Sequence, residues 1–392
     1  MTLAPPTQEY DLFSLEFAEH RADVLRELRE RHPIHWHENY GFWTFARYAD
    51  VERTARDTKR FSSLGSPAIL DDEGTPNYEV QVRRLSARDD PGHKVLRKLS
   101  ARAFTRRRLK ELELSLSTMA HTLLDDVEAK LLSGQSVDYV RDFAYRLPVL
   151  AVNAILGVPD DVLEFLTDYD TRAKGTVLDY FADLVERRRL SPGDDVISQI
   201  VSAVDDGNEY LTPDEVHYFV AGFWTAGNLT TTNLFSHAAL ALQDMPEAAR
   251  DVASDPHLME GFIEEVLRTE SPTTASFKIA KNDVEVDGHL IRRGQKVWLM
   301  WAAANRDPGQ FPDPDTFDMR RNPNQHLAFS HGPHYCLGAP LARLESRIGL
   351  QALLQRRLPM RLDVENAQRI WGRNQYGFQT IPITPGPHGW PN

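Results

Sequence analysis

The sequence predicts one large, mainly helical domain with small β-sheets at its side. Helical spacing of apolar residues runs through most of the 392 residues, whereas alternating strand patterns are few and short. No internal repeat, low-complexity linker or shift in composition marks a domain boundary. We therefore expect 1–392 to form a single domain, with a flexible N-terminus over 1–14.

The composition limits the possible function classes. With 41% hydrophobic and 26% charged residues, the chain has the make-up of an ordinary globular protein. Its formal net charge of −12 argues against nucleic acid or an anionic membrane surface as a partner. The single cysteine excludes an intramolecular disulfide and any cysteine-rich metal site. The absence of a signal peptide and of a membrane-length apolar segment predicts a cytoplasmic protein.

Helices are predicted from apolar periodicity and from capping residues. The clearest start is Leu211–Glu215, where Thr212 can cap the helix, Pro213 fits its first turn and Glu215 completes a capping box. The apolar stretch that follows must be buried nearly all round. In chain order, we expect helices over about 94–132, 160–189, 216–242, 255–269 and 340–357.

The predicted strands are short and fall in three places. The runs 34–37 and 42–45 flank Asn39-Tyr40-Gly41, which is a hairpin signal. A second hairpin is expected from 284–286 to 297–301, turning at Asp287-Gly288, and a third small sheet near 380–383. The segment 303–329 is rich in Pro and Asn, which predicts irregular backbone.

The lone cysteine lies in the segment Phe329-Ser330-His331-Gly332-Pro333-His334-Tyr335-Cys336-Leu337-Gly338. A single cysteine is most often an inert apolar side chain, but these neighbours favour a functional thiolate. Gly332 and Gly338 allow close backbone approach, and a helix predicted to begin just after Gly338 would direct its amides at the sulfur. A metal ligand is the favoured role, with a nucleophile assisted by His334 as the alternative.

This segment, Phe-x-x-Gly-x-His-x-Cys-x-Gly, resembles the haem-binding loop of the cytochrome P450 family. Glu265-Val266-Leu267-Arg268 is similar to the family's Glu-x-x-Arg element, and Arg321 stands where the family has an arginine that meets this pair. Ala304–Pro308 is also typical of the family at this spacing. The resemblance implies the cytochrome P450 fold and a haem b whose iron is bound by the Cys336 thiolate.

The resemblance also implies which residues hold the haem. His93 and Arg97, four positions apart on one predicted helix, correspond to family residues that bind the two propionates, as does His334. Phe329 and Gly338 would lie around the sulfur. The family often has an arginine where this chain has Lys278, which can supply the charge but not a bidentate contact.

The segment Ala226–Thr232 resembles the family's oxygen-binding helix, usually Ala-Gly-x-(Asp/Glu)-Thr-Thr. Gly227 would allow local opening of the helix, and the hydroxyl of Thr230 would help deliver protons, unless it only bonds back to the Ala226 carbonyl. Leu229 replaces the usual acid, so Asn228 and water are the expected proton source. A substrate carboxylate or hydroxyl completing the relay, or chemistry that needs fewer protons, are the alternatives.

The function implied is a monooxygenase that uses O₂ and two electrons to hydroxylate or epoxidise a small organic substrate, such as a secondary metabolite. The alternatives are a cytochrome P450 that performs oxidative coupling, peroxygenation or nitration with nitric oxide, and a haem-thiolate sensor of a gas or ligand without turnover. The segment 158–188, which by resemblance holds the family's lid helices, is shorter than usual, which suggests an open mouth for a substrate that is large or tethered to a carrier protein.

A basic segment indicates the electron donor. Eight basic residues and no acid lie between Lys94 and Lys110, in a chain of net charge −12. Such a run is often only a solvated helix face. By resemblance, however, this helix lies on the cysteine side of the haem, where a ferredoxin or flavodoxin, reduced by its NAD(P)H reductase, would dock.

Overall fold

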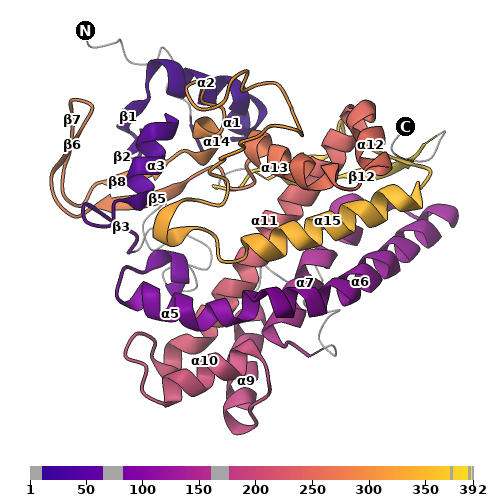
Figure 1. The fold of residues 1–392 in the computed structure, drawn as a ribbon, viewed down its shortest axis with the longest axis horizontal. Helices are drawn as coiled ribbons and strands as arrows, with labels where there is room; N and C mark the ends of the chain where they lie inside the picture. Colours follow the sequence, from indigo (N-terminus) through magenta and orange to yellow (C-terminus); the bar gives the residue numbers. More distant parts are fainter. Residues whose placement is uncertain (1–10, 65–82, 160–175, 371–373, 387–389, 391–392) are drawn as a thin grey trace.

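The computed structural model describes residues 11–64, 83–159, 176–370, 374–386 and 390. Helices form most of the fold; the largest sheet and the β6-β7 hairpin (284–291) lie at the left of the view, whereas β12 (Pro382–Pro385), of another small sheet, lies at the right near the C-terminus (Figure 1). The predicted mainly helical fold with small sheets is therefore confirmed. The helices are α1 (Leu15–Glu19), α2 (Arg21–Arg31), α3 (Tyr48–Arg56), α5 (Gly92–Ser100), α6 (Arg106–Leu132), α7 (Arg146–Leu156), α9 (Thr176–Leu190), α10 (Val196–Asp205), α11 (Val216–Asp244), α12 (Pro246–Ser254), α13 (Leu258–Glu270), α14 (Trp301–Ala304) and α15 (Ala339–Arg356).

The sheets divide the strands into four groups. The largest sheet has the order β1-β2-β8-β5-β3, with β2 and β8 parallel and the other pairs antiparallel. The others are β4-β12-β9, β10-β11 and β6-β7. The strands are β1 (Ile34–His37), β2 (Phe42–Phe45), β3 (Phe61–Ser62), β4 (Val137–Asp138), β5 (Ser276–Ala280), β6 (Val284–Val286), β7 (His289–Ile291), β8 (Lys296–Leu299), β9 (Met360–Leu362), β10 (Gln368–Arg369), β11 (Phe378–Thr380) and β12 (Pro382–Pro385).

Helix α11 runs through the centre of the helical part and packs on α7, α9, α13 and α15 (Figure 1). The predicted capping box at its start is present, with Thr212 and Glu215 bonding each other's backbone amides. Close packing depends on small residues: at Gly349 of α15, a Cβ atom would lie 2.6 Å from the ring of Phe235. Helices α11 and α15 therefore approach closely along their length.

Several predicted boundaries were wrong. The stretch 94–132 is not one helix, because a 3₁₀ turn at Ala101–Phe104 separates α5 from α6, and Thr105 then caps α6. The helix expected to begin at 255 begins at Leu258. Part of the predicted helix 160–189 lies outside the described residues, as does much of the lid region 158–188. The described residues of this prediction, from 176 onward, form α9, which ends at Leu190.

The second hairpin was paired incorrectly. The strand β6 pairs with β7, directly after the Asp287-Gly288 turn, and not with 297–301. The strand β8 instead joins the large sheet between β2 and β5, and Trp301 already belongs to α14. The region near 380–383 contributes to two sheets, because β11 pairs with β10 whereas β12 pairs with β4 and β9.

The beginning of the described chain is packed on the domain. Leu12 is buried, Phe13 contacts the rings of Tyr40 and Trp298, and Ser14 caps α1. The expectation of a flexible N-terminus was therefore wrong for residues 11–14, and residues 1–10 lie outside the described part. Among the helices of the described residues, none has the length and apolarity to cross a bilayer.

Candidate active site around Cys336

The cysteine lies in a tight loop that ends where α15 begins. The Cys336 amide donates to the Phe329 carbonyl at 2.8 Å, and the Tyr335 amide donates to the Gly332 carbonyl at 3.0 Å. Gly332 has a φ of +70°, and a Cβ atom there would lie 3.2 Å from the Arg56 backbone, so the loop needs glycine at this position. Phe329 is buried beneath the Arg343 guanidinium, whose central carbon is 4.6 Å from the ring centroid.

The sulfur of Cys336 accepts hydrogen bonds from the amides of Gly338 and Ala339, as the position of the helix start predicted. These amides and the Arg97 charge lower the pKa of the thiol, as expected, and so favour the thiolate. Desolvation by the surrounding atoms outweighs them and raises the pKa above its ordinary value, although the residue as a whole is exposed. A bound metal cation would supply the charge that the protein alone does not.

Four basic side chains predicted from the sequence come together beside this loop. They come from α5 (His93, Arg97), from β5 (Lys278) and from the loop itself (His334). The imidazoles of His93 and His334 lie with ring centroids 4.1 Å apart. The hydroxyl of Ser63 joins the group, since it accepts from Lys278 Nζ at 2.6 Å and lies 3.0 Å from His334 Nε2.

The charges of this group fit an anion. Burial lowers the pKa of Lys278 to about 8, and burial together with the charge of Lys278 lowers that of His334 to about 2. His93 Nε2 is buried without a hydrogen-bond partner among the described residues. A carboxylate placed here would pair with these groups and remove the cost of burying them. These residues therefore fit the two propionates that a haem would bring to this site, and Cys336 would be available as a ligand for its iron.

Two members of the site were not predicted. Ser63 lies 215 positions from Lys278, and no local pattern identifies it. Arg343 forms a bidentate ion pair with Glu264 of α13, with both N–O distances at 2.7 Å, and lowers the pKa of this carboxyl to about 2. Its position seven residues after the cysteine, on the predicted helix, was the signal that could have found it.

The predicted oxygen-binding segment lies in the middle of α11. Ala226 is exposed although most of the helix around it is buried, so this face of α11 borders open space. Thr230 lies one turn further along this face, and its hydroxyl donates to the Ala226 carbonyl at 2.8 Å, which is the alternative role considered for it. This bond leaves the oxygen lone pairs of Thr230 available.

Gly227 does not open the helix, and that expectation was wrong. The helix α11 is continuous from Val216 to Asp244. At Gly227 a Cβ atom would lie 2.6 Å from a methyl group of Val152, so the glycine allows α7 to pack closely against α11.

Asn228 is buried, and neither its amide nitrogen nor its amide oxygen has a hydrogen-bond partner among the described residues. Glu345 of α15 is also buried and hydrogen-bonds Thr231, which lies next to Thr230. Burial raises the pKa of Glu345 to about 8, so this carboxyl group is mostly protonated near neutral pH. The sequence reasoning did not predict this residue.

Substituting Glu345 should change how stability depends on pH. Because its pKa in the folded protein is about 8, above its ordinary value of 4.5, the folded state keeps a proton that the unfolded chain releases. Its contribution to stability is therefore full below pH 4.5 and is lost as the pH rises towards 8. Glu345→Gln should match the parent at pH 4.5 and exceed its stability by about 4 kcal/mol at pH 7.5, because about 1.4 kcal/mol is lost per pH unit between the two pKa values. Denaturant titration of the haem-loaded proteins at pH 4.5 and at pH 7.5 measures their free energies of unfolding. A difference between variant and parent that is the same at both pH values would contradict the prediction.

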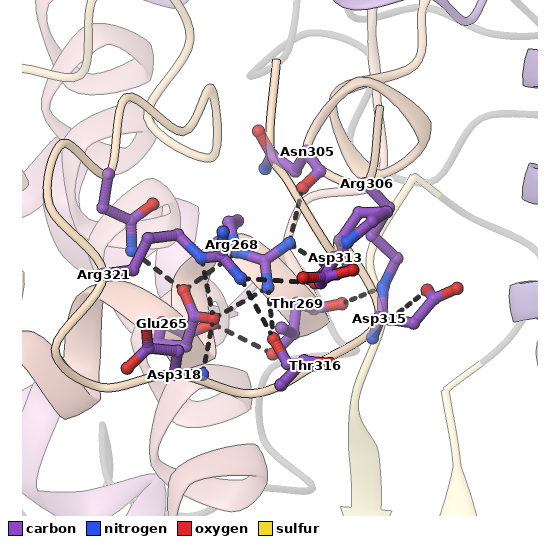
Figure 2. Close-up of polar contacts among 12 residues, drawn as sticks. Glu265, Arg268, Thr269, Asn305, Arg306, Asp313, Asp315, Thr316, Asp318 and Arg321 are labelled. Atoms are coloured by element: carbon purple, nitrogen blue, oxygen red, sulfur yellow. Dashed lines mark hydrogen bonds and ion pairs between the residues drawn. The ribbon is translucent and has the colours of Figure 1, made fainter. Parts of the chain in front are cut away.

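A buried ionic network fixes the segment that leads to the cysteine loop (Figure 2). Arg268 donates to both oxygens of Glu265, at 2.7 and 2.9 Å, and both side chains are fully buried. Arg321 Nε donates to Glu265 at 3.2 Å, which confirms the expected meeting of the three residues. The carbonyls of Asn305 and Thr316 accept from Arg268, so the network spans α13 and the irregular segment.

Comparison with known proteins agrees with this geometry. The model of the family "Cytochrome P450" matches residues 151–358. The mycinamicin IV hydroxylase/epoxidase of Micromonospora griseorubida is 36% identical over 370 residues, which cover 88% of this chain and 90% of that protein. The cyclomarin C epoxidase CymV of Salinispora arenicola (strain CNS-205) is 35% identical over 352 residues, covering 85% and 87%.

Among solved structures, P450BioI in complex with an acyl carrier protein that carries hexadec-9Z-enoic acid superposes with a TM-score of 0.82. The two sequences are 29% identical, and the superposition covers 94% of this chain and 100% of that chain. The similarity therefore extends over nearly the whole fold.

Proposed function

The chain belongs to the cytochrome P450 family, and from this premise we propose that Cys336 is the axial ligand of its haem iron. The protein is a haem b monooxygenase that hydroxylates or epoxidises an organic substrate with O₂ and electrons supplied from outside. The observation that supports the role of Cys336 best is its place at the start of α15, with two amides on the sulfur. When bound, the haem supplies the redox chemistry that activates O₂.

The propionates are proposed to bind His93, Arg97, Lys278 and His334. Support comes from the convergence of these cationic or neutral donors from three separate elements and from the buried, unpartnered Nε2 of His93. Phe329 excludes water from the cysteine side of the site, and Gly338 leaves its surface free of a side chain. Arg343 positions Phe329 through its ion pair with Glu264.

The hydroxyl of Thr230 is proposed to hold, through its available lone pairs, the water that delivers protons to the reacting oxygen, because its own hydrogen is bonded to the Ala226 carbonyl. Its support is the exposed face of α11 at Ala226 and Thr230, where the helix borders open space. Leu229 cannot ionise, and Asn228 is buried rather than directed at solvent, so protons must reach Thr230 through water or through a group on the substrate. Gly227 contributes by packing rather than by chemistry.

Turnover distinguishes this enzyme from a sensor. The test mixes the holoprotein with a ferredoxin, its reductase and, one at a time, the members of a library of organic compounds. Compounds that shift the Soret band from low to high spin should also cause NADPH consumption and be converted to oxygenated product. Spectral shifts without any product would contradict the proposed activity. The native substrate could also be held on a carrier protein, as in the P450BioI complex, and acylated carrier proteins belong in the same library.

An acidic ferredoxin or flavodoxin is the proposed electron donor. Lys94, Lys98, Arg102, Arg106, Arg107 and Lys110 are exposed on α5, the 3₁₀ turn and the first turns of α6. Helix α6 packs along α15, which begins at the cysteine loop, and Arg97 of α5 interacts electrostatically with Cys336, which supports a position of this basic surface near the sulfur (Figure 1 shows the helices). An acidic partner would be attracted to this surface, and its electrons would then have only a short distance to travel to the haem.

Reversing charge on this surface should slow electron delivery. We expect the double variant Lys98→Glu/Arg102→Glu to reduce haem at about one tenth of the parent rate at low ionic strength, and to lose most of the salt dependence. Stopped-flow reduction by an acidic ferredoxin measures both. The control is Arg250→Glu on α12, an exposed arginine outside this surface, which should leave the rate unchanged. An equal loss in both variants would contradict docking at α5 and α6.

A further inference from the structure

Arg84 lies just before α5, where the chain crosses the face of α11. Its side chain packs on Gly222, where a Cβ atom would lie only 3.0 Å from Arg84 Cγ. A side chain at position 222 would force the stem of this arginine to shift. The contact depends on both residues, because the glycine leaves room on the helix surface for the long side chain of Arg84 to pack there.

The guanidinium of Arg84 has no partner among the described residues. Its Nε is buried without a hydrogen bond, and no described residue forms an ion pair with it. Burial lowers its pKa to about 10, and no neighbouring carboxylate offsets this shift. The group is still charged at neutral pH, and burying an unpaired charge costs free energy. The side chain as a whole is only partly buried, so an anion can reach its terminal nitrogens.

Two neighbouring arginines show that this lack of a partner is specific to Arg84. Arg83 lies 3.8 Å and Arg88 3.7 Å from Glu215, at the start of α11. Arg83 also stacks over the Tyr218 ring, and Arg88 donates to the Tyr210 carbonyl at 2.9 Å. Glu215 is therefore already shared by Arg83 and Arg88, whereas Arg84 packs on a different part of α11, at Gly222.

The surface of α11 beneath Arg84 leads to Thr230, the residue proposed for proton delivery. Gly222, Ala226 and Thr230 follow one another at intervals of four residues and so lie on one face of the helix. Ala226 on this face is exposed, whereas Trp224, Asn228 and Thr231 on the opposite side are buried. Eight residues of helix separate Gly222 from Thr230, which is about 12 Å. This face joins an unpaired cation at one end to the oxygen-binding position at the other.

We propose that Arg84 binds the carboxylate of the substrate, so that this enzyme oxidises an apolar organic acid at a carbon about 10 Å from its acid group. The inference rests on the proposed function, because it takes Thr230 as the position next to the reacting carbon. It also bears on the missing acid at Leu229, since the substrate itself brings a carboxylate into the site.

Binding of matched acids and esters tests this proposal. Straight-chain acids of about 8 to 14 carbons and their methyl esters are titrated into the haem-loaded protein, with the dissociation constant from calorimetry and the spin shift of the Soret band as readouts. The parent should bind the best acid about 10- to 100-fold more tightly than its ester. Arg84→Gln should remove that preference and leave ester binding unchanged, whereas Arg84→Lys should keep part of it. Arg88→Gln is the matched control and should keep the full preference.

Three outcomes would overturn the proposal: no preference for acids in the parent, a preference retained in Arg84→Gln, or an equal loss of acid and ester affinity in that variant. The carbon monoxide complex of each reduced protein is recorded in parallel. If the parent lacks the thiolate-type spectrum, the proposed ligand role of Cys336 fails. If the spectrum is intact in every variant and only the acid preference is absent, the role of Arg84 alone fails.

Discussion

Replacing Cys336 by serine should abolish the thiolate-type spectrum of the reduced carbon monoxide complex and reduce turnover by more than about 100-fold. Losing a residue that merely supports a metal ligand already costs about 10- to 100-fold in many metal sites, so losing the ligand itself should cost more. Cys336 is the only cysteine in the chain, and no second thiol can take its place. Spectra of the purified proteins, followed by product formation with an artificial reductase system, provide the measurement.

The control for this substitution is Tyr335→Phe, which removes a hydroxyl next to the cysteine but leaves the sulfur. The Tyr335 hydroxyl accepts a hydrogen bond from Arg343 at 3.1 Å, and the Tyr335 backbone helps to close the loop. This variant should keep the thiolate-type spectrum. A serine variant with the parent's absorption bands and product yield would instead require a different iron ligand.

Glu265→Gln should destabilise the protein by about 3–5 kcal/mol. The carboxylate of Glu265 is fully buried and accepts from Arg268, Arg321 and the Asp318 amide. The substitution keeps the shape but removes the charge, so Arg268 remains buried without its counter-ion. Since a folded protein is stable by only about 5–15 kcal/mol, this variant should also lose haem more readily.

Denaturant unfolding of the holoprotein measures this loss, and the rate of haem transfer to apomyoglobin reports how well the site is retained. Glu260→Gln on the same helix is the control, because Glu260 is exposed and should change stability by less than about 0.5 kcal/mol. A loss below about 1 kcal/mol for Glu265→Gln would show that the network contributes little to stability.

The main helices and some strands could be predicted because their signals are local. The capping box at Thr212 and Glu215, the hairpin at 34–45 and the helix after Cys336 each depend on residues within a few positions of one another. The failures have non-local causes. The Asp287-Gly288 turn was identified, but the partner of 297–301 is set by a parallel pairing with β2, more than 250 positions away, which no local pattern encodes.

The residues of the site, too, could be predicted where their signal is local and not where it depends on distant segments. The cysteine loop and the pair Glu265–Arg268 are short motifs, and the sequence places their members next to one another on a loop or one helix face. The group of His93, Lys278 and His334 could be listed only through resemblance to a family, because its members come from separate elements. Ser63, Arg343 and Glu345 were missed, since hydroxyls, arginines and glutamates are common and only burial identifies them.

By itself, the sequence determined the fold class and the family, and it identified the cysteine proposed as the iron ligand. These follow from hydrophobic periodicity and from a motif whose residues are consecutive in the chain. Only the tertiary structure decided that Gly227 serves packing against Val152, that Asn228 faces the interior, and that Arg84 lies unpaired over Gly222. The physical reason is that charge pairing and desolvation depend on which distant segments meet, and that arrangement exists only once the helices have packed.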